Sequence, residues 1–82
     1  MIKRYKSALI TGAASGIGYS ILKKLSKYKL KIYALDKNKL KLKKICDETG
    51  AYPLNLDITD TDLLYSKLSK LNIDILVSNA GI

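Results

Sequence analysis

The sequence has no histidine, no tryptophan and no phenylalanine, and its 82 residues include a single cysteine. One cysteine cannot form an intramolecular disulfide, and without histidine it cannot complete a zinc site of the Cys/His type. The lack of histidine also excludes the Ser-His-Asp arrangement of hydrolases. No apolar run approaches the roughly 20 residues of a membrane-spanning helix, and the N-terminus is not typical of a secretion signal. We therefore expect one small cytoplasmic domain with no membrane partner.

Acidic residues are few: 7 Asp and Glu stand against 15 Lys and Arg, which gives a net charge of +8. All but one of the basic residues are lysines, whereas proteins that read nucleic acids favour arginine for bidentate contacts to guanine and phosphate. The lysines fall between apolar residues, as on the outer faces of amphipathic helices. We interpret them as solvated surface and do not expect a nucleic-acid partner.

Four short apolar runs alternate with three longer amphipathic segments. The runs are bounded by Gly, Asp or Asn, which is typical of strands buried in a parallel sheet. We expect strands at residues 7–11, 30–35, 51–56 and 73–78. This β-α-β-α-β-α-β order predicts an α/β fold with right-handed crossovers. Pro53 removes a hydrogen-bond donor, so the third strand should lie at an edge.

The amphipathic segments carry helix signals of unequal strength. The apolar stripes are Ile17, Ile21, Leu25 and Tyr28 in the first segment, and Leu64, Leu68 and Leu71 in the third. We expect Thr59 to cap the third helix. In the less regular middle segment, residues 37–49, we expect Leu40 and Ile45 to face inward, while Leu42 fits that face poorly. Gly50 should end this helix.

A glycine-rich loop, residues 11–18, lies between the first strand and the first helix. Gly12 allows a sharp turn out of the strand, and Gly16 allows backbone amides to approach a pyrophosphate. Gly18 allows the helix to pack closely on the sheet. The free N–H groups at the start of that helix attract negative phosphates. The loop therefore predicts a dinucleotide site.

A second signal is Asp36, at the end of the second strand and 18 residues after Gly18. A carboxylate there accepts hydrogen bonds from ribose hydroxyls and repels a 2′-phosphate. The alternative is that Asp36 only caps the following helix, and both roles are compatible. Lys37 would tolerate a 2′-phosphate, whereas Ser15 brings no positive charge toward one. We expect NAD in preference to NADP.

The spacing Gly-x3-Gly-x-Gly in residues 11–18 resembles the cofactor loop of the short-chain dehydrogenases/reductases. Residues 55–60 (Asn-Leu-Asp-Ile-Thr-Asp) resemble that family's segment after the third strand, and residues 78–81 (Ser-Asn-Ala-Gly) resemble its Asn-Ala-Gly motif. The three motifs follow the family's order over essentially the whole chain. The resemblance implies a partial Rossmann-type sheet with strand order 3-2-1-4, in which residues 1–82 are the N-terminal part of a dinucleotide-binding domain.

The resemblance also implies a set of cofactor-binding residues. They are Gly12, Ser15, Gly16, Ile17, Gly18, Asp36, Asp57, Ile58, Asn79, Ala80 and Gly81. The loop members would line the pyrophosphate and adenosine side of NAD, and Asp36 would hold the adenine ribose. Asp57 and Ile58 would flank the adenine, Asn79 would brace the sheet, and the two residues after it would pass under the cofactor. Taken alone, Asp57 also fits a strand end or a helix entry, and residues 79–81 also fit a plain turn.

In the family, a later Ser and a later Tyr-x-x-x-Lys carry the chemistry, in which hydride passes between nicotinamide and a carbonyl or alcohol carbon. Neither follows the Asn-Ala-Gly match here, so we expect a fragment that contains no catalytic residue and is inactive alone. Two Tyr-x-x-x-Lys coincidences begin at Tyr19 and Tyr33, away from the family's position. Cys46, with no base or partner, is interpreted as an ordinary helix residue rather than a reactive thiol.

Three functions stay open at this point. The chain is the cofactor-binding half of a short-chain dehydrogenase/reductase, a non-catalytic nucleotide-binding module that acts through a partner, or a basic interaction domain for RNA. In the first two, half a sheet leaves the fourth strand with an exposed hydrophobic edge. We therefore expect self-association through that edge.

Overall fold

A four-stranded parallel sheet is the framework of the molecule. The computed structural model describes residues 6–79. The elements are β1 (Ser7–Thr11), α1 (Gly16–Leu25), β2 (Lys31–Asp36), α2 (Lys39–Thr49), β3 (Tyr52–Asn55), α3 (Thr61–Leu68) and β4 (Ile75–Val77). The strands lie in the order β3-β2-β1-β4, and all three neighbouring pairs are parallel. The predicted α/β class and strand order are confirmed.

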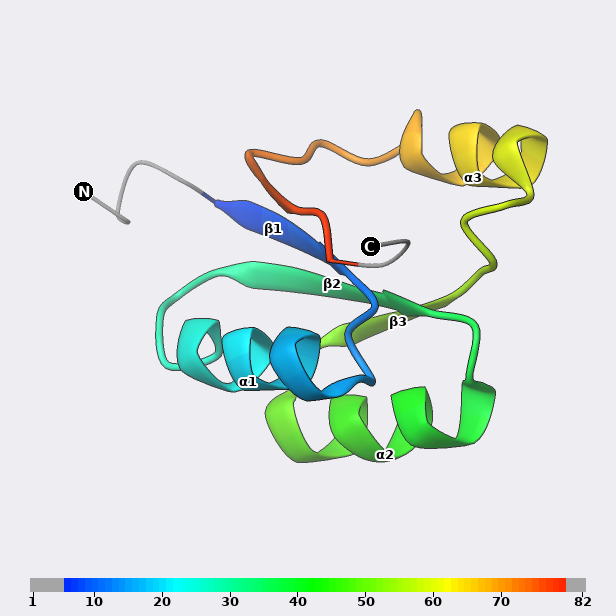
Figure 1. Cartoon of the computed structure of the whole chain (residues 1–82). Coiled ribbons are helices and arrows are strands. Elements are labelled where there is room, and N and C mark those ends of the chain that lie inside the picture. Colours follow the sequence, from blue (N-terminus) through cyan, green and yellow to red (C-terminus); the bar gives the residue numbers. More distant parts are fainter. Residues whose placement is uncertain (1–5, 80–82) are drawn as a thin grey trace.

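Two helices lie on one face of the sheet and one on the other. Figure 1 shows α1 and α2 side by side below the sheet and α3 above it. At one edge, β3 carries Pro53 opposite Ala34 of β2, which confirms the edge position predicted from the missing donor. None of the helices within residues 6–79 is both long and apolar enough to cross a bilayer.

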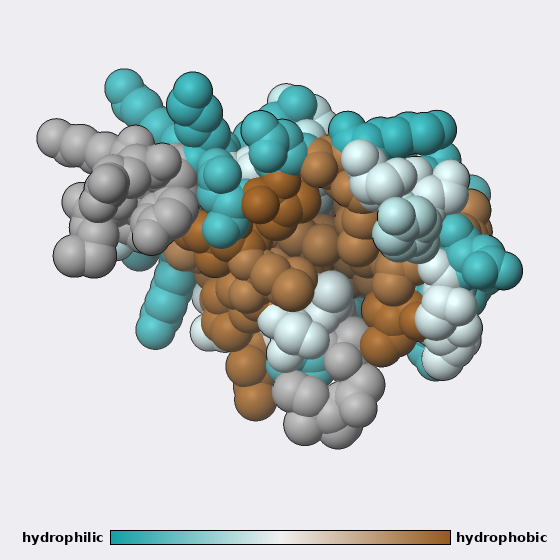
Figure 2. Space-filling model, turned by 90° about the horizontal axis from the view of Figure 1, so that it is seen from above, coloured by the Kyte–Doolittle hydropathy of each residue, from teal (hydrophilic) through white to brown (hydrophobic). Residues whose placement is uncertain are grey.

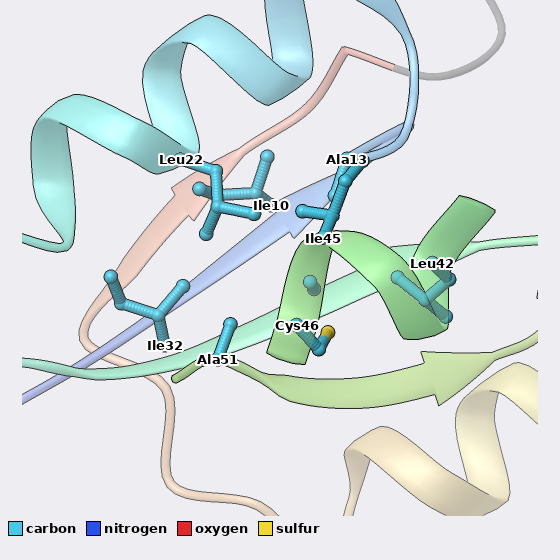
Figure 3. Close-up of a cluster of buried hydrophobic side chains, with 9 residues drawn as sticks. Ile10, Ala13, Leu22, Ile32, Leu42, Ile45, Cys46 and Ala51 are labelled. Atoms are coloured by element: carbon cyan, nitrogen blue, oxygen red, sulfur yellow. The ribbon is translucent and has the colours of Figure 1, made fainter. Parts of the chain in front are cut away.

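The larger hydrophobic core lies between the sheet and the α1–α2 layer (Figure 3). Its buried residues are Ile10, Ala13, Leu22, Ile32, Ala34, Leu42, Ile45, Cys46 and Ala51. Leu22 of α1 and Leu42 of α2 are almost fully shielded from solvent. This cluster joins both helices to β1 and β2, which positions the loop between β1 and α1.

The stripe predicted for α1 is wrong at both ends. Ile17 is 70% exposed, and Tyr28 lies beyond the end of α1 and is 51% exposed. The buried positions are instead Gly18 and Leu22, four residues apart on one helix face. Because Gly18 packs against the loop, this face turns toward the sheet and the first-turn side chain of Ile17 turns outward.

The inward face predicted for α2 is also partly wrong. Leu42, Ile45 and Cys46 are the buried residues, spaced three and four apart, whereas Leu40 is 81% exposed. Asn38 caps α2 by accepting a hydrogen bond from the Lys41 N–H, which fixes where the helix begins. Leu40 and Leu42 are two positions apart, so they point to opposite sides of a helix.

The third helix is capped by Asp60 rather than by Thr59. The Asp60 side chain accepts a hydrogen bond from the Leu63 N–H, and α3 ends at Leu68, so the predicted stripe residue Leu71 lies outside it. No residue of α3 is buried, although Leu64 and Leu68 pack against the smaller core of this face.

That smaller core, on the α3 face, contains Leu9, Leu35 and Leu56 as its buried residues. Leu76 of β4 pairs with Leu9 of β1 and is 64% exposed. Figure 2, viewed from above, shows a broad apolar area on this face between more polar surroundings. The α3 face of the sheet is therefore covered much less completely than the α1–α2 face.

Candidate functional site

A groove lies at the carboxyl ends of the strands, which all meet at one edge because the sheet is parallel. Its volume is about 470 Å³, within the range of small-molecule sites. The lining residues are Gly12, Ser15, Leu35, Asp36, Lys37, Leu56, Asp57, Ile58, Thr59 and Asn79. They come from the ends of β1, β2 and β3 and from the residue two positions after β4, so residues far apart in the sequence share one site.

Close packing fixes the shape of the glycine-rich loop on one side of the groove. Gly12 has a φ of 65°, a conformation that favours glycine. A Cβ on Gly18 would lie 2.2 Å from the Gly12 carbonyl oxygen and 2.9 Å from the Asn79 side-chain nitrogen. A Cβ on Gly16, in contrast, would meet no atom within 4 Å. Gly18 is therefore needed for the fold, whereas Gly16 leaves open space above the start of α1.

Asn79 connects the loop to β4. Its side-chain amide donates hydrogen bonds to the Gly12 carbonyl and the Ser15 hydroxyl, both at 3.3 Å. Its backbone N–H donates to Thr11 Oγ1 at 2.9 Å, and Thr11 Oγ1 in turn donates to the Val77 carbonyl at 3.4 Å. These bonds join the end of β4 to the first residues of the loop on one side of the groove.

Asp36 lies on the opposite side of the loop from Asn79. Its Oδ2 accepts a hydrogen bond from the Ala14 N–H at 3.0 Å, and its Oδ1 accepts one from the Asn38 N–H at 2.9 Å. The Ala13 N–H adds a bond to the Leu35 carbonyl at 3.1 Å. The cap of α2 is Asn38, so the alternative in which Asp36 is only a helix cap is wrong.

Asp57 lies in a tight turn after β3. Its Oδ1 accepts hydrogen bonds from the Thr59 N–H at 2.9 Å and the Thr59 hydroxyl at 2.8 Å. Bonds of this kind stabilise the ionised carboxylate, and they hold the pKa of Asp57 below its ordinary value. The lining of the groove thus contains two carboxylates, Asp36 and Asp57, together with the positive charge of Lys37.

The structure brings most of the predicted site residues together. Those that line the groove are Gly12, Ser15, Asp36, Asp57, Ile58 and Asn79. Gly16 and Ile17 lie at the exposed start of α1, beside the loop, and Gly18 is buried beneath it. Ala80 and Gly81 are outside the described residues. Leu35, Leu56 and Thr59 were missed because an isolated Leu or Thr carries no chemical signal in the sequence.

The residues set aside as coincidences stay outside the groove. The Tyr19 hydroxyl donates to the Glu48 carboxylate, which raises the pKa of Tyr19, and Tyr33 packs on the α3 face. Cys46 is buried, and burial, followed by the Asp47 charge, raises the pKa of its thiol. The interpretation of Cys46 as an ordinary helix residue agrees with this environment. No cluster of three metal-ligating side chains occurs within residues 6–79.

Comparison with protein families gives one decisive match. Residues 6–82 match the family model described as short chain dehydrogenase. The chain belongs to this family. The glycine loop, the carboxylate after β2 and Asn79 all lie within the matched residues.

Individual relatives agree with the family assignment. A short-chain type dehydrogenase/reductase from Sinorhizobium fredii, itself uncharacterised, is 37% identical over 81 residues, which cover 99% of this chain and 33% of that protein. An NADP-dependent 3-hydroxy acid dehydrogenase from Shigella flexneri is 33% identical, over 90% of this chain and 33% of its own length. The chain thus spans about a third of the length of these relatives.

Among solved structures, BdcA in complex with NADPH superimposes with a TM-score of 0.85 at 33% identity. The match covers 94% of this chain and 32% of BdcA. The fold of this chain is therefore that of the corresponding third of a short-chain dehydrogenase, and the family is one that binds nicotinamide cofactors.

Proposed function

We propose that this chain holds NAD as the N-terminal cofactor-binding part of a short-chain dehydrogenase/reductase that oxidises an alcohol or reduces a carbonyl. The observation that carries the proposal is the groove in which the glycine loop, Asp36 and Asp57 come together at the carboxyl ends of the strands. In this arrangement the loop binds the pyrophosphate, Asp36 binds the adenine ribose, and Asp57 with Ile58 flanks the adenine.

The residues fit a dinucleotide. The open space at Gly16 admits a phosphate close to the backbone at the start of α1, where the helix N–H groups favour negative charge. Each oxygen of the Asp36 carboxylate accepts one backbone N–H and keeps a further acceptor position for a ribose hydroxyl. Leu35, Leu56 and Ile58 give the adenine end of the groove apolar walls.

The described residues bind and orient; they do not carry out the reaction. NAD, when bound, supplies hydride chemistry at its nicotinamide. Asp36 orients the adenosine half of the cofactor, and the side-chain amide of Asn79 holds the loop against the end of β4. We expect the 82 residues alone to be inactive, because the family's catalytic Ser and Tyr-x-x-x-Lys do not occur at the family's positions among them. A non-catalytic module that binds a nucleotide for a partner is the second proposal.

NAD is proposed over NADP because of the charge of Asp36. A 2′-phosphate on the adenine ribose would lie beside this carboxylate, and like charges at such distances repel. Two proteins similar to this chain are named as NADP-dependent or bound to NADPH, so the proposed preference for NAD rests on the charge of Asp36 alone. Lys37, in the groove lining, reduces the repulsion without removing it.

Two further proposals accompany this function. The outer edge of β4, with the exposed side chain of Leu76, is where we propose that copies of the chain associate. The cytoplasm as the working compartment stays a prediction from the sequence.

Titration calorimetry with NADH tests the proposal on the chain as it stands. We expect one saturable site, NADPH binding on the order of tenfold more weakly, and little change at moderate salt. Gly16→Val places a side chain in the open space above α1 and should weaken NADH binding by tenfold or more. Ser20→Val is the matched control, since Ser20 is an exposed position of the same helix away from the groove.

Two outcomes contradict the proposal. NADH binding that is equal in wild type and Gly16→Val, with the chain folded, would show that the loop does not bind the pyrophosphate. An absence of NADH binding together with RNA binding that falls steeply with salt would favour the basic interaction domain instead.

A further inference from the structure

The Asp36 carboxylate holds the glycine loop in place without any bound ligand. Its two oxygens accept hydrogen bonds from two different segments: Oδ2 from the Ala14 N–H of the loop and Oδ1 from the Asn38 N–H at the start of α2. A carboxylate has about four acceptor positions, so this leaves one on each oxygen. Holding the loop and binding a ribose therefore do not compete for the same lone pairs.

The loop is otherwise held mainly from the β4 side. The Asn79 amide bonds to the Gly12 carbonyl and the Ser15 hydroxyl, and the Ser15 hydroxyl also donates to the Gly12 carbonyl. On the β2 side, the bonds to the loop are Ala13 N–H to the Leu35 carbonyl and Ala14 N–H to Asp36. Only the second of these is made by a side chain, and hydrogen bonds to ionised groups are stronger than neutral ones.

We propose that Asp36 is a positioning residue for the glycine loop, in addition to the ribose contact that the proposed function assigns to it. The carboxylate fixes the Ala14 amide against β2 and so sets the direction of the amides that precede α1. The positioning role does not depend on cofactor identity; only its consequence for phosphate binding rests on the proposed function.

The proposal predicts effects of different size for the substitutions Asp36→Asn and Asp36→Ala. In Asp36→Asn, the oxygen accepts one N–H, while the new NH₂ group faces the other N–H, donor against donor. In Asp36→Ala neither N–H keeps its partner. Loosening of the loop at Ala14 should therefore increase from aspartate to asparagine to alanine.

The first test uses the uniformly ¹⁵N-labelled chain without cofactor. Hydrogen exchange at Ala14 should be faster by on the order of tenfold in Asp36→Asn and more in Asp36→Ala. Asp57→Asn is the matched control: it should change exchange at Thr59 and leave Ala14 unaffected.

The second test uses inorganic pyrophosphate, which has no ribose. If Asp36 contacts only the ribose, Asp36→Ala removes a negative charge and strengthens pyrophosphate binding. If Asp36 positions the loop, the same change weakens pyrophosphate binding by about threefold or more despite the lost repulsion. The change in pyrophosphate affinity caused by Asp36→Ala therefore has opposite signs under the two roles.

The outcomes separate this inference from the proposed function. Ala14 exchange that is equal in all variants overturns the positioning role even if NADH binds. Ala14 exchange that increases from wild type to the Asp36 variants, in a chain that binds neither NADH nor pyrophosphate, supports the positioning role and overturns the proposed function. If Asp36→Ala does not fold, Ala14 exchange in Asp36→Asn still decides the matter.

Discussion

Within residues 6–79, nine buried residues form the hydrophobic cluster on the α1–α2 face of the sheet, whereas three form the cluster on the α3 face. The two parts of the sequence also differ in charge: residues 16–50 contain ten lysines and three acidic residues, and residues 51–79 contain two lysines and four acidic residues. The helices of the first face each have buried residues, while α3 has none.

This difference indicates that the helices on the two faces are held to the sheet by different interactions. Packing holds α1 and α2, with lysines on their outer surface. Hydrogen bonds of the turn at Asp57 and of the Asp60 cap hold the entry to α3, above a sheet surface that stays partly apolar and open. The glycine loop belongs to the packed side, because Gly18 and Leu22 share one face of α1.

The largest expected effect is on the packed face. Leu22→Ala removes a fully buried side chain and should lower the free energy of unfolding by about 2–5 kcal/mol, whereas Leu64→Ala, on partly buried α3, should cost about 1 kcal/mol. Urea denaturation of the two variants measures the difference. If Leu22→Ala fails to fold, Ile10→Val, with an expected cost of about 0.5–1.5 kcal/mol, takes its place and is compared with Ile73→Val on the α3 face, which should cost less because Ile73 is only partly buried. Equal losses on both faces would contradict the comparison.

An intermediate effect is expected at the open face. Leu76→Lys should weaken self-association on the order of tenfold in sedimentation velocity, because a charge then lies at the exposed edge of β4. The free energy of unfolding should change by no more than about 0.5 kcal/mol, since Leu76 is mostly exposed. Leu63→Lys, at a 43% exposed position of α3, is the control. A sedimentation profile unchanged by Leu76→Lys would place the contact elsewhere.

The smallest expected effect is the loss of stability at low pH. Because the pKa of Asp57 in the folded chain is lower than its ordinary 3.8, its ionised form adds stability above that pH, and this stability is lost as the pH falls through the folded value. Thr59→Val removes one of the two bonds and should raise the pKa of Asp57 toward 3.8, as read from its side-chain resonance. On acidification, amides of α3 should shift before those around Leu22; the reverse order would show that the turn does not hold α3.

The strands and the loop could be predicted from the sequence because their signals are local. The four apolar runs, bounded by turn residues, predict the ends of β1 to β4 to within two residues. The glycine spacing predicts that the site lies at the carboxyl ends of these strands. The helix faces were harder: the Lys-Leu alternation around Leu40 and Leu42 fits two orientations, and only the Asn38 cap and the sheet behind α2 choose between them.

Contacts between distant segments could not be predicted. The bond from Ala14 to Asp36 depends on the loop folding back onto β2, and nothing in the sequence near either residue signals it. The same holds at the other end of the sheet, where the Asp74 carboxylate accepts the N–H groups of Lys6 and Ser7, 68 and 67 residues away. From the sequence, Asp74 indicates only the start of a strand.

The bonds from Asn79 to Thr11 and Gly12 have a consequence for biosynthesis. The loop leaves the ribosome well before Asn79, since the amide that bonds to it is made 67 residues after Gly12. Until that late residue emerges, the nascent chain has a packed first layer and an unfinished binding surface, so a ligand present during translation could be captured only at the last step of this segment's folding.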